Sequence, residues 1–276
     1  HTPLEWHKEL FDFARRKKIK IFSTPFDESA VAFLEKLNCP MYKIASFEMT
    51  DIPLLKAVAM TKKPVIISTG MASLKEIEYT YISAKKFGIK DITLLYCVSK
   101  YPASRNDFNI NNIKILKRKF KCRVGFSDHS KNSKIAAAAV AAGAEVIEKH
   151  IALDDQKDGL DIKFSLKGKQ IKSFRNTIDE TQQLLGVKKF YRNKSENKSK
   201  IFRRSIFVVK DIKKGEVFTK DNIRRIRPGN GISPIHYEKL LNKKSNYSIK
   251  AGLPLKMNFV ATILNKKVSK REKLEL

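Results

Sequence analysis

Two histidines, each placed just after an apolar run, are the residues of this sequence best suited to chemistry. His129 follows Ser127 by two positions, and His150 follows Glu148 by two positions. Two neutral imidazoles, a carboxylate and a hydroxyl suit a divalent ion that keeps positions open for a substrate. A single histidine more often hydrogen-bonds a loop. The paired placement instead favours a metal site held by His129 and His150.

The elements that must position these residues can be inferred from the segments around them. The apolar runs Cys122–Phe126 and Ala144–Ile147 predict two strands, and Lys134–Ala142 between them predicts a helix that ends at Gly143. A strand, helix and strand of this length make the two strands parallel neighbours. Because side chains alternate along a strand, the polar residues at the two strand ends would then converge.

The same alternation of strand and helix runs through the first two-thirds of the chain, with helix-period apolar residues in segments such as 29–34 and 73–78. Such repetition is typical of a (β/α)8 TIM barrel in the α/β class, whose active site lies at the C-terminal ends of the strands. An open doubly wound sheet is the alternative, but it would concentrate its ligand groups at one switch point. Four more strand-like runs end in polar residues: Ile19–Thr24, Met41–Ser46, Val65–Gly70 and Ile92–Cys97.

The predicted strands number six, two fewer than a closed barrel requires. Natural sheets rarely leave such edges unpaired. We therefore expect that the first two strand–helix units of the barrel lie outside this sequence.

Eight short segments, found in order along nearly the whole chain, together resemble the sialic acid synthase family. They are 23–26 (STPF), 42–48 (YKIASFE), 68–71 (STGM), 101–102 (YP), 125–129 (GFSDH), 147–150 (IEKH), 159–161 (GLD) and 227–231 (RPGNG). The resemblance implies a metal-dependent barrel enzyme. Such an enzyme condenses phosphoenolpyruvate with an N-acetylated aldose to give a nine-carbon 2-keto sugar acid, and releases phosphate.

Within this family, segment 42–48 is closer to the pseudaminic acid synthases, which implies a 2,4-diacetamido-trideoxy hexose as the aldose. N-acetylneuraminate or legionaminate synthesis is the alternative. By the same resemblance, His129 and His150 would hold manganese, which would polarise the sugar aldehyde. Glu148 would orient or deprotonate the water that adds at C2, or would instead steer a histidine.

Phosphoenolpyruvate carries several negative charges, so its pocket needs a fixed cation and several hydrogen-bond donors. The resemblance assigns these roles to Lys43, Ser46, Ser68, Ser99 and Ser127, and it places Tyr101 and Asp161 beside the sugar. The sequence also departs from the family, which often has Asn at position 99 and Gly-Pro-Asp at 159–161. The units expected outside the sequence would carry a further acidic residue and a further lysine of the site.

A polar, lysine-rich stretch separates the barrel region from a smaller C-terminal region. We predict a barrel domain over 1–187, a linker over 188–204 and an antifreeze-like (SAF) domain over 205–276. In the family this last domain reaches across a domain-swapped homodimer and lends an arginine to the partner's sugar pocket. That residue would be Arg227, although an arginine beside a Pro-Gly turn can also be merely solvated.

Composition limits the remaining choices. The 276 residues carry 57 Lys and Arg against 28 Asp and Glu, a net charge of +29. A basic nucleic-acid-binding protein built on a barrel scaffold is therefore an alternative of another class. The lysines, however, are spread along the chain, and aromatic residues are not interleaved with them.

No apolar run is long enough to span a bilayer. The cysteines Cys39, Cys97 and Cys122 are scattered without pair spacing, which favours the reducing cytoplasm.

Three interpretations are therefore consistent with the sequence: a phosphoenolpyruvate-dependent nonulosonic acid synthase, a basic binding protein, and a catalytically inactive relative or fragment. Metal binding at His129 and His150 separates the first from the second, since a scaffold does not need it. Strongly salt-dependent binding to DNA or RNA would favour the second.

Overall fold

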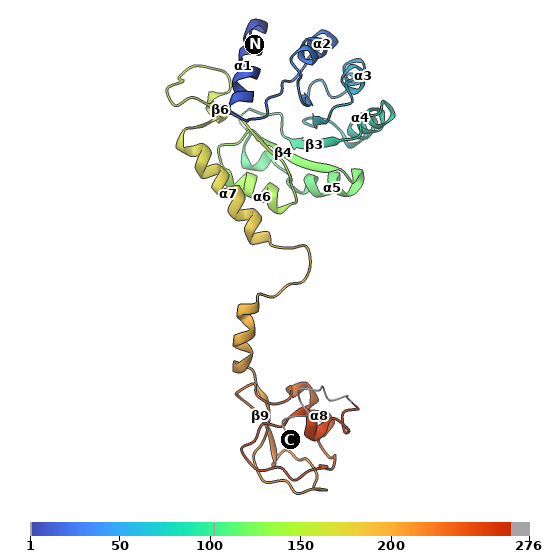
Figure 1. Ribbon diagram of the computed structural model, residues 1–276, viewed down its shortest axis with the longest axis vertical. Helices are drawn as coiled ribbons and strands as arrows, with labels where there is room; N and C mark the ends of the chain where they lie inside the picture. Colours follow the sequence, from blue (N-terminus) through green and yellow to red (C-terminus); the bar gives the residue numbers. More distant parts are fainter. Residues whose placement is uncertain (1, 102, 266–276) are drawn as a thin grey trace. The chain divides into compact units, whose positions relative to one another are not determined.

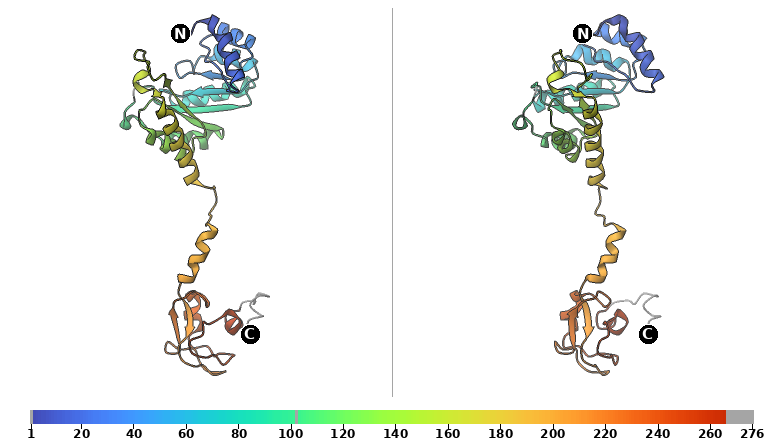
Figure 2. Two further views of the ribbon diagram at one scale, coloured as in Figure 1. Left: turned by 60° about the vertical axis from the view of Figure 1, so that its left-hand side comes forward. Right: turned by 90° about the vertical axis from the view of Figure 1, so that its left-hand side faces the viewer.

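The computed structural model describes residues 2–101 and 103–265. The chain divides into two compact units, His1–Gly186 and Val187–Leu276, and each is described here by itself (Figures 1 and 2). Pro102 and residues 266–276, which belong to the predicted 101–102 segment and to the predicted C-terminal domain, lie outside the described residues.

A parallel sheet with the strand order β1-β2-β3-β4-β5 forms the centre of the first unit. The strands are β1 (Tyr42–Ile44), β2 (Val65–Ser68), β3 (Ile92–Cys97), β4 (Arg123–Asp128) and β5 (Ile147–Lys149). Each is connected to the next by a helix, and Figure 1 shows the helices in succession along the outside of the sheet. This arrangement is that of a partial α/β barrel.

The helices begin where polar side chains cap their first turns. Asp27, Asp51, Ser73 and Asn132 each accept a hydrogen bond from a backbone N–H at a helix start. At the other end, Gly143 adopts a φ of 104°, which stops the helix before β5. The helices of this unit are α1 (Leu4–Arg16), α2 (Glu28–Lys36), α3 (Ile52–Met60), α4 (Leu74–Lys86), α5 (Asn111–Phe120), α6 (Ser133–Ala141) and α7 (Lys169–Leu185).

Apolar side chains from the sheet and the helices form one core. Tyr42, Ile44, Ile67, Leu94 and Phe126 are essentially inaccessible to solvent, and they belong to the same hydrophobic cluster. Burial of this kind is the main favourable contribution to folding. The core holds the strands rigidly, so side chains at their C-terminal ends have fixed positions.

One predicted strand is wrong. Residues Ile19–Thr24 form no strand, although Ile21 and Phe22 pack against the core as an apolar run should. A strand requires a hydrogen-bonded neighbour, and among the described residues β1 pairs only with β2. The other five predicted strands are confirmed, with shifted ends: β5 is Ile147–Lys149, so Glu148 lies within the strand.

Short elements follow β5 and lead into α7. They are β6 (Ile151–Ala152), the 3-10 helix η2 (Ile162–Phe164) and β7 (Leu166–Lys167), which pairs with β6. A further 3-10 helix, η1 (Arg105–Asp107), lies between β3 and α5. Residues 188–204, predicted as a linker, contain the 3-10 helix η3 (Lys194–Phe202), and every residue from 188 to 204 is exposed.

The second unit has its own small core around an antiparallel pair, β8 (Ser205–Val208) and β9 (Ile223–Ile226). Ile206, Phe218 and Leu255 are fully buried in it. Its remaining elements are η4 (Pro234–His236), α8 (Tyr237–Leu240) and α9 (Met257–Val260). Among the described residues of the whole chain, no helix combines the length and apolar character needed to cross a bilayer.

Replacing Ser205 with Ala is expected to destabilise the second unit by about 1–3 kcal/mol. The buried Ser205 hydroxyl donates to the Pro228 carbonyl at 2.7 Å and accepts from the Gly231 N–H at 2.9 Å, so its loss leaves both groups unpaired. Urea denaturation of the full chain measures the effect. Ser248→Ala, at an exposed hydroxyl that accepts from the Lys214 N–H, is the control. Equal effects of the two variants would contradict the prediction.

Candidate active site

The candidate active site is built on the C-terminal ends of neighbouring parallel strands. Ser127 on β4 lies opposite Glu148 on β5 in the strand register. The Ser127 hydroxyl donates to Oε1 of Glu148 at 2.6 Å. Lys43 of β1 reaches the same carboxylate, with its Nζ 3.5 Å from Oε2. The predicted convergence of these residues is therefore present, and one carboxylate is held between a hydroxyl and an ammonium group.

The two histidines lie side by side next to this carboxylate. The ring centroids of His129 and His150 are 5.4 Å apart. His129 is only 4% exposed, and its Nδ1 lies 3.1 Å from the carbonyl oxygen of Val98. We assign Nδ1 as the donor in this contact, because a carbonyl can only accept, and Nε2 then keeps its lone pair. Burial lowers the pKa of His129, although the hydrogen bond to the Val98 carbonyl acts in the opposite direction. The lowered pKa favours the neutral imidazole.

The second imidazole is oriented by the loop that follows β6. Nδ1 of His150 lies 3.3 Å from a carboxylate oxygen of Asp161. Each histidine thus has its Nδ1 engaged by an oxygen, an arrangement typical of imidazoles that bind a metal through Nε2.

Two imidazole nitrogens are suitable ligands for a divalent ion. Among the described residues, however, no group of three His, Cys, Asp or Glu side chains gathers in a metal-binding cluster. Metal binding by His129 and His150 therefore stays a prediction.

Aromatic side chains enclose the histidine pair. The ring of Tyr101 lies 4.3 Å from that of His129, and the ring of Phe164 lies 5.0 Å from that of His150, centroid to centroid. Burial raises the pKa of Tyr101, so its hydroxyl keeps its proton. The sequence predicted Tyr101 at the site but not Phe164. The only signal for Phe164 was that it is the single aromatic residue between β6 and β7.

The predicted serines gather at the ends of the neighbouring strands. The Gly70 N–H donates to the Ser46 hydroxyl at 3.0 Å, and the Cys97 sulfur lies 3.3 Å from Ser46 Oγ and 3.8 Å from Ser99 Oγ. Ser68, at the end of β2, is 2% exposed, and its hydroxyl has no hydrogen-bond partner among the described residues. A role for these hydroxyls in binding an anionic ligand stays a prediction. Cys97 was not predicted as part of the site.

Arg227 belongs to a different unit from the other predicted site residues. It is exposed and follows β9 in the second unit, whereas every other predicted site residue belongs to the first. A role for Arg227 at the site therefore stays a prediction.

Comparisons with known proteins show which sequences and structures this chain is similar to. Pseudaminic acid synthase from Helicobacter pylori is 41% identical over 255 residues, which are 92% of this chain and 75% of that protein. N,N'-diacetyllegionaminic acid synthase from Campylobacter jejuni is 44% identical over 245 residues, or 87% of this chain and 73% of that protein.

A solved structure of N-acetylneuraminic acid synthetase from Leptospira borgpetersenii, in complex with citrate, matches with a TM-score of 0.69 at 35% identity, covering 72% of this chain and 70% of that one. A spore coat polysaccharide biosynthesis protein E from Chromobacterium violaceum matches with a TM-score of 0.82 at 27% identity, covering 94% and 79%. Residues 203–261 match the SAF domain, and residues 1–190 match the NeuB family. These findings confirm the resemblance inferred from the motifs, and the chain belongs to the NeuB family.

Proposed function

We propose that this protein condenses phosphoenolpyruvate with an N-acetylated aldose to form a nine-carbon 2-keto sugar acid, and that phosphate is released. The observation that carries the proposal is the Glu148 carboxylate, held between Ser127 and Lys43 beside the paired imidazoles of His129 and His150. The relatives named pseudaminic acid, legionaminic acid and N-acetylneuraminate-9-phosphate synthases support it. They do not favour the alternative of a basic nucleic-acid-binding protein on a barrel scaffold.

In the proposed reaction, C3 of phosphoenolpyruvate attacks the aldehyde carbon of the sugar, and the aldehyde oxygen takes up a proton. C2 becomes electron-poor, and water adds to it with loss of a proton. The tetrahedral carbon then expels phosphate by C–O cleavage, which leaves the ketone. Glu148 orients this water and accepts its proton, because it is the carboxylate next to the proposed phosphoenolpyruvate site.

The other side chains bind and orient the substrates. Lys43, on the sheet beside Glu148, supplies the fixed positive charge for phosphoenolpyruvate. Tyr101 and Asp161 border the histidine pair and face the sugar. A manganese ion held by His129 and His150 would supply Lewis acidity to the aldehyde oxygen. The side chains proposed to bind the phosphate and carboxylate are Ser46, Ser68, Ser99 and Ser127.

The finer features of the proposal concern specificity and assembly. A 2,4-diacetamido-trideoxy hexose is the proposed aldose, in keeping with the similarity to pseudaminic acid synthases. The sheet is proposed to belong to a (β/α)8 barrel, since β1 and β5 are each paired on one edge only among the described residues. Arg227 is proposed to act in a domain-swapped homodimer. The free thiols of Cys39, Cys97 and Cys122 support a cytoplasmic location.

Phosphate release by the full-length protein tests the function. Mn²⁺, phosphoenolpyruvate and one N-acetylated hexose at a time are supplied, and we expect release with the diacetamido-trideoxy hexose. Release only with N-acetylmannosamine would contradict the proposed aldose and favour N-acetylneuraminate synthesis. No release with any sugar would overturn the proposed function and would leave the fold unaffected.

A further inference from the structure

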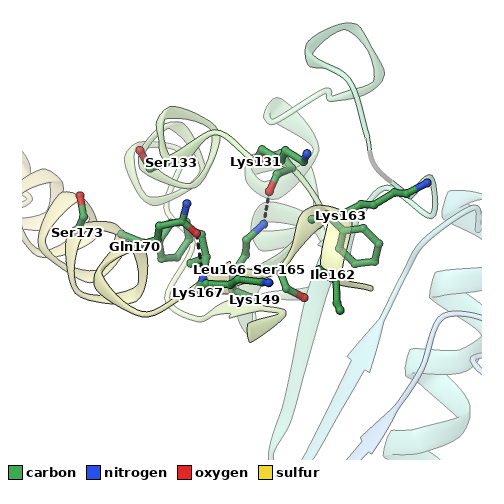
Figure 3. A pocket seen from close by; sticks show the side chains of 13 residues that line it. Lys131, Ser133, Lys149, Ile162, Lys163, Ser165, Leu166, Lys167, Gln170 and Ser173 are labelled. Atoms are coloured by element: carbon green, nitrogen blue, oxygen red, sulfur yellow. Dashed lines mark hydrogen bonds between the residues drawn. The ribbon is translucent and has the colours of Figure 1, made fainter. Parts of the chain in front are cut away.

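A lysine lies directly behind the histidine pair, on the other face of the sheet. Lys149 is the residue between Glu148 and His150, and alternation along β5 turns its side chain away from theirs. This side chain is only 6% exposed. Its amine points toward the loop after β4, at the edge of a cavity of about 380 Å3 (Figure 3).

The Lys149 ammonium group hydrogen-bonds the backbone on both sides of His129. Its Nζ donates to the Asp128 carbonyl oxygen at 3.0 Å and, in a short contact, to the Ser130 carbonyl oxygen. These carbonyls belong to the residues immediately before and after His129. The same Nζ lies 3.5 Å from the Asp128 carboxylate, whose other oxygen accepts from the Ser130 N–H at 2.8 Å. One buried cation thus fixes the chain on both sides of His129.

The strand register connects this arrangement to the imidazoles. Asp128 and Lys149 are paired residues at the ends of β4 and β5, and His129 and His150 immediately follow these two strands. Any movement of the 128–130 backbone away from Lys149 would therefore move His129 relative to His150. Two ligands on separate strands bind one ion well only when their spacing is preset.

We propose that Lys149 is a positioning residue that sets the spacing of His129 and His150, and thereby the affinity of this pair for a divalent ion. The inference rests on the proposed function, because it takes the two imidazoles as the metal ligands. The competing explanation is that Lys149 is only the counter-ion of Asp128, which is fully buried and would be costly to leave unpaired.

Two substitutions separate these explanations. Lys149→Met keeps the length and volume of the side chain but removes all three donors. Asp128→Asn removes the buried negative charge while its oxygen can still accept from the Ser130 N–H. The double variant therefore has no unpaired charge, yet it still lacks the contacts to the carbonyls of Asp128 and Ser130. Lys163→Met is the matched control, because Lys163 lines the same cavity but is exposed and points away from it (Figure 3).

Titration with Mn²⁺ alone, followed by electron paramagnetic resonance, tests the inference in the full-length protein. We expect Lys149→Met to weaken Mn²⁺ binding by about 10- to 100-fold. The double variant should regain thermal stability but not Mn²⁺ affinity, and Asp128→Asn and Lys163→Met should bind as the wild type does. If Lys149→Met does not fold, the double variant still gives the measurement.

The outcomes distinguish the two proposals. Wild-type affinity in Lys149→Met, or its restoration in the double variant, would overturn the positioning role alone. Wild-type protein that binds Mn²⁺ but never releases phosphate would overturn the proposed function, while the variants would still test the role of Lys149. Absence of Mn²⁺ binding by the wild type would overturn both the metal site and this inference.

Discussion

Replacing Glu148 with Gln is expected to lower kcat for phosphate release by about 100- to 10,000-fold, the usual contribution of a general base. The amide has nearly the same shape as the carboxylate and can still accept from the Ser127 hydroxyl. It cannot, however, take a proton from the water that adds at C2. The KM for phosphoenolpyruvate should not rise, because the change removes a negative charge that lies 3.5 Å from Lys43.

Steady-state kinetics and Mn²⁺ titration together make this test specific. Glu148 contacts Lys43 and Ser127, so Mn²⁺ affinity should be unchanged if Glu148 acts on water. A marked loss of Mn²⁺ affinity with a modest loss of kcat would instead show that Glu148 steers a histidine. Glu145→Gln is the control, since Glu145 is an exposed carboxylate just before β5 that pairs with Lys117.

Replacing Gly70 with Ala is expected to disrupt the proposed phosphoenolpyruvate site. A Cβ at this position would lie 2.0 Å from Ser99 Oγ, 2.7 Å from Cys97 Sγ and 2.8 Å from Ser46 Oγ. All three are short side chains on buried or partly buried backbone, so they cannot swing away as a long side chain would. We expect a rise of roughly 100-fold or more in the KM for phosphoenolpyruvate and a loss of about 1–3 kcal/mol of stability from overpacking.

A second substitution relieves the closest contact and makes the test decisive. Removing the hydroxyl in Gly70→Ala/Ser99→Ala should recover much of the lost stability, because the 2.0 Å contact is to Ser99 Oγ. Ser99→Ala alone provides the reference for both the KM and the thermal midpoint. Wild-type KM and stability in Gly70→Ala would show that the packing around this glycine is not as described.

The centre of the site could be predicted in part because it depends on strand periodicity and on which strands are neighbours. Alternation places Ser127 and Glu148 at the ends of adjacent parallel strands, and the register that pairs them joins their side chains at 2.6 Å. The same reasoning brought His129 and His150 together. A regular strand carries its side chains in fixed directions, so sequence spacing is sufficient there.

The features that could not be predicted depend on contacts between elements far apart in the chain. Residues Ile19–Thr24 have the apolar pattern of a strand, but pairing is decided by a neighbour and not by the pattern. Phe164 contacts His150 from the short helix η2, and Cys97 contacts Ser46 across two strand ends. The role of Lys149 could not be predicted because its partners are backbone carbonyls. Every residue has such a carbonyl, so the sequence does not indicate which ones a lysine will contact.

The buried hydroxyl of Ser68 has a consequence for the energetics of the whole unit. Among the described residues this hydroxyl has no hydrogen-bond partner, and a hydroxyl removed from water in this way costs a folded chain about 1–3 kcal/mol. In the proposed function, a phosphate or carboxylate oxygen of the substrate accepts its hydrogen and recovers that free energy on binding. Part of the proposed affinity for the anion would then be stored in the free protein as lost stability, and heat resistance and ligand occupancy would be linked properties of this unit.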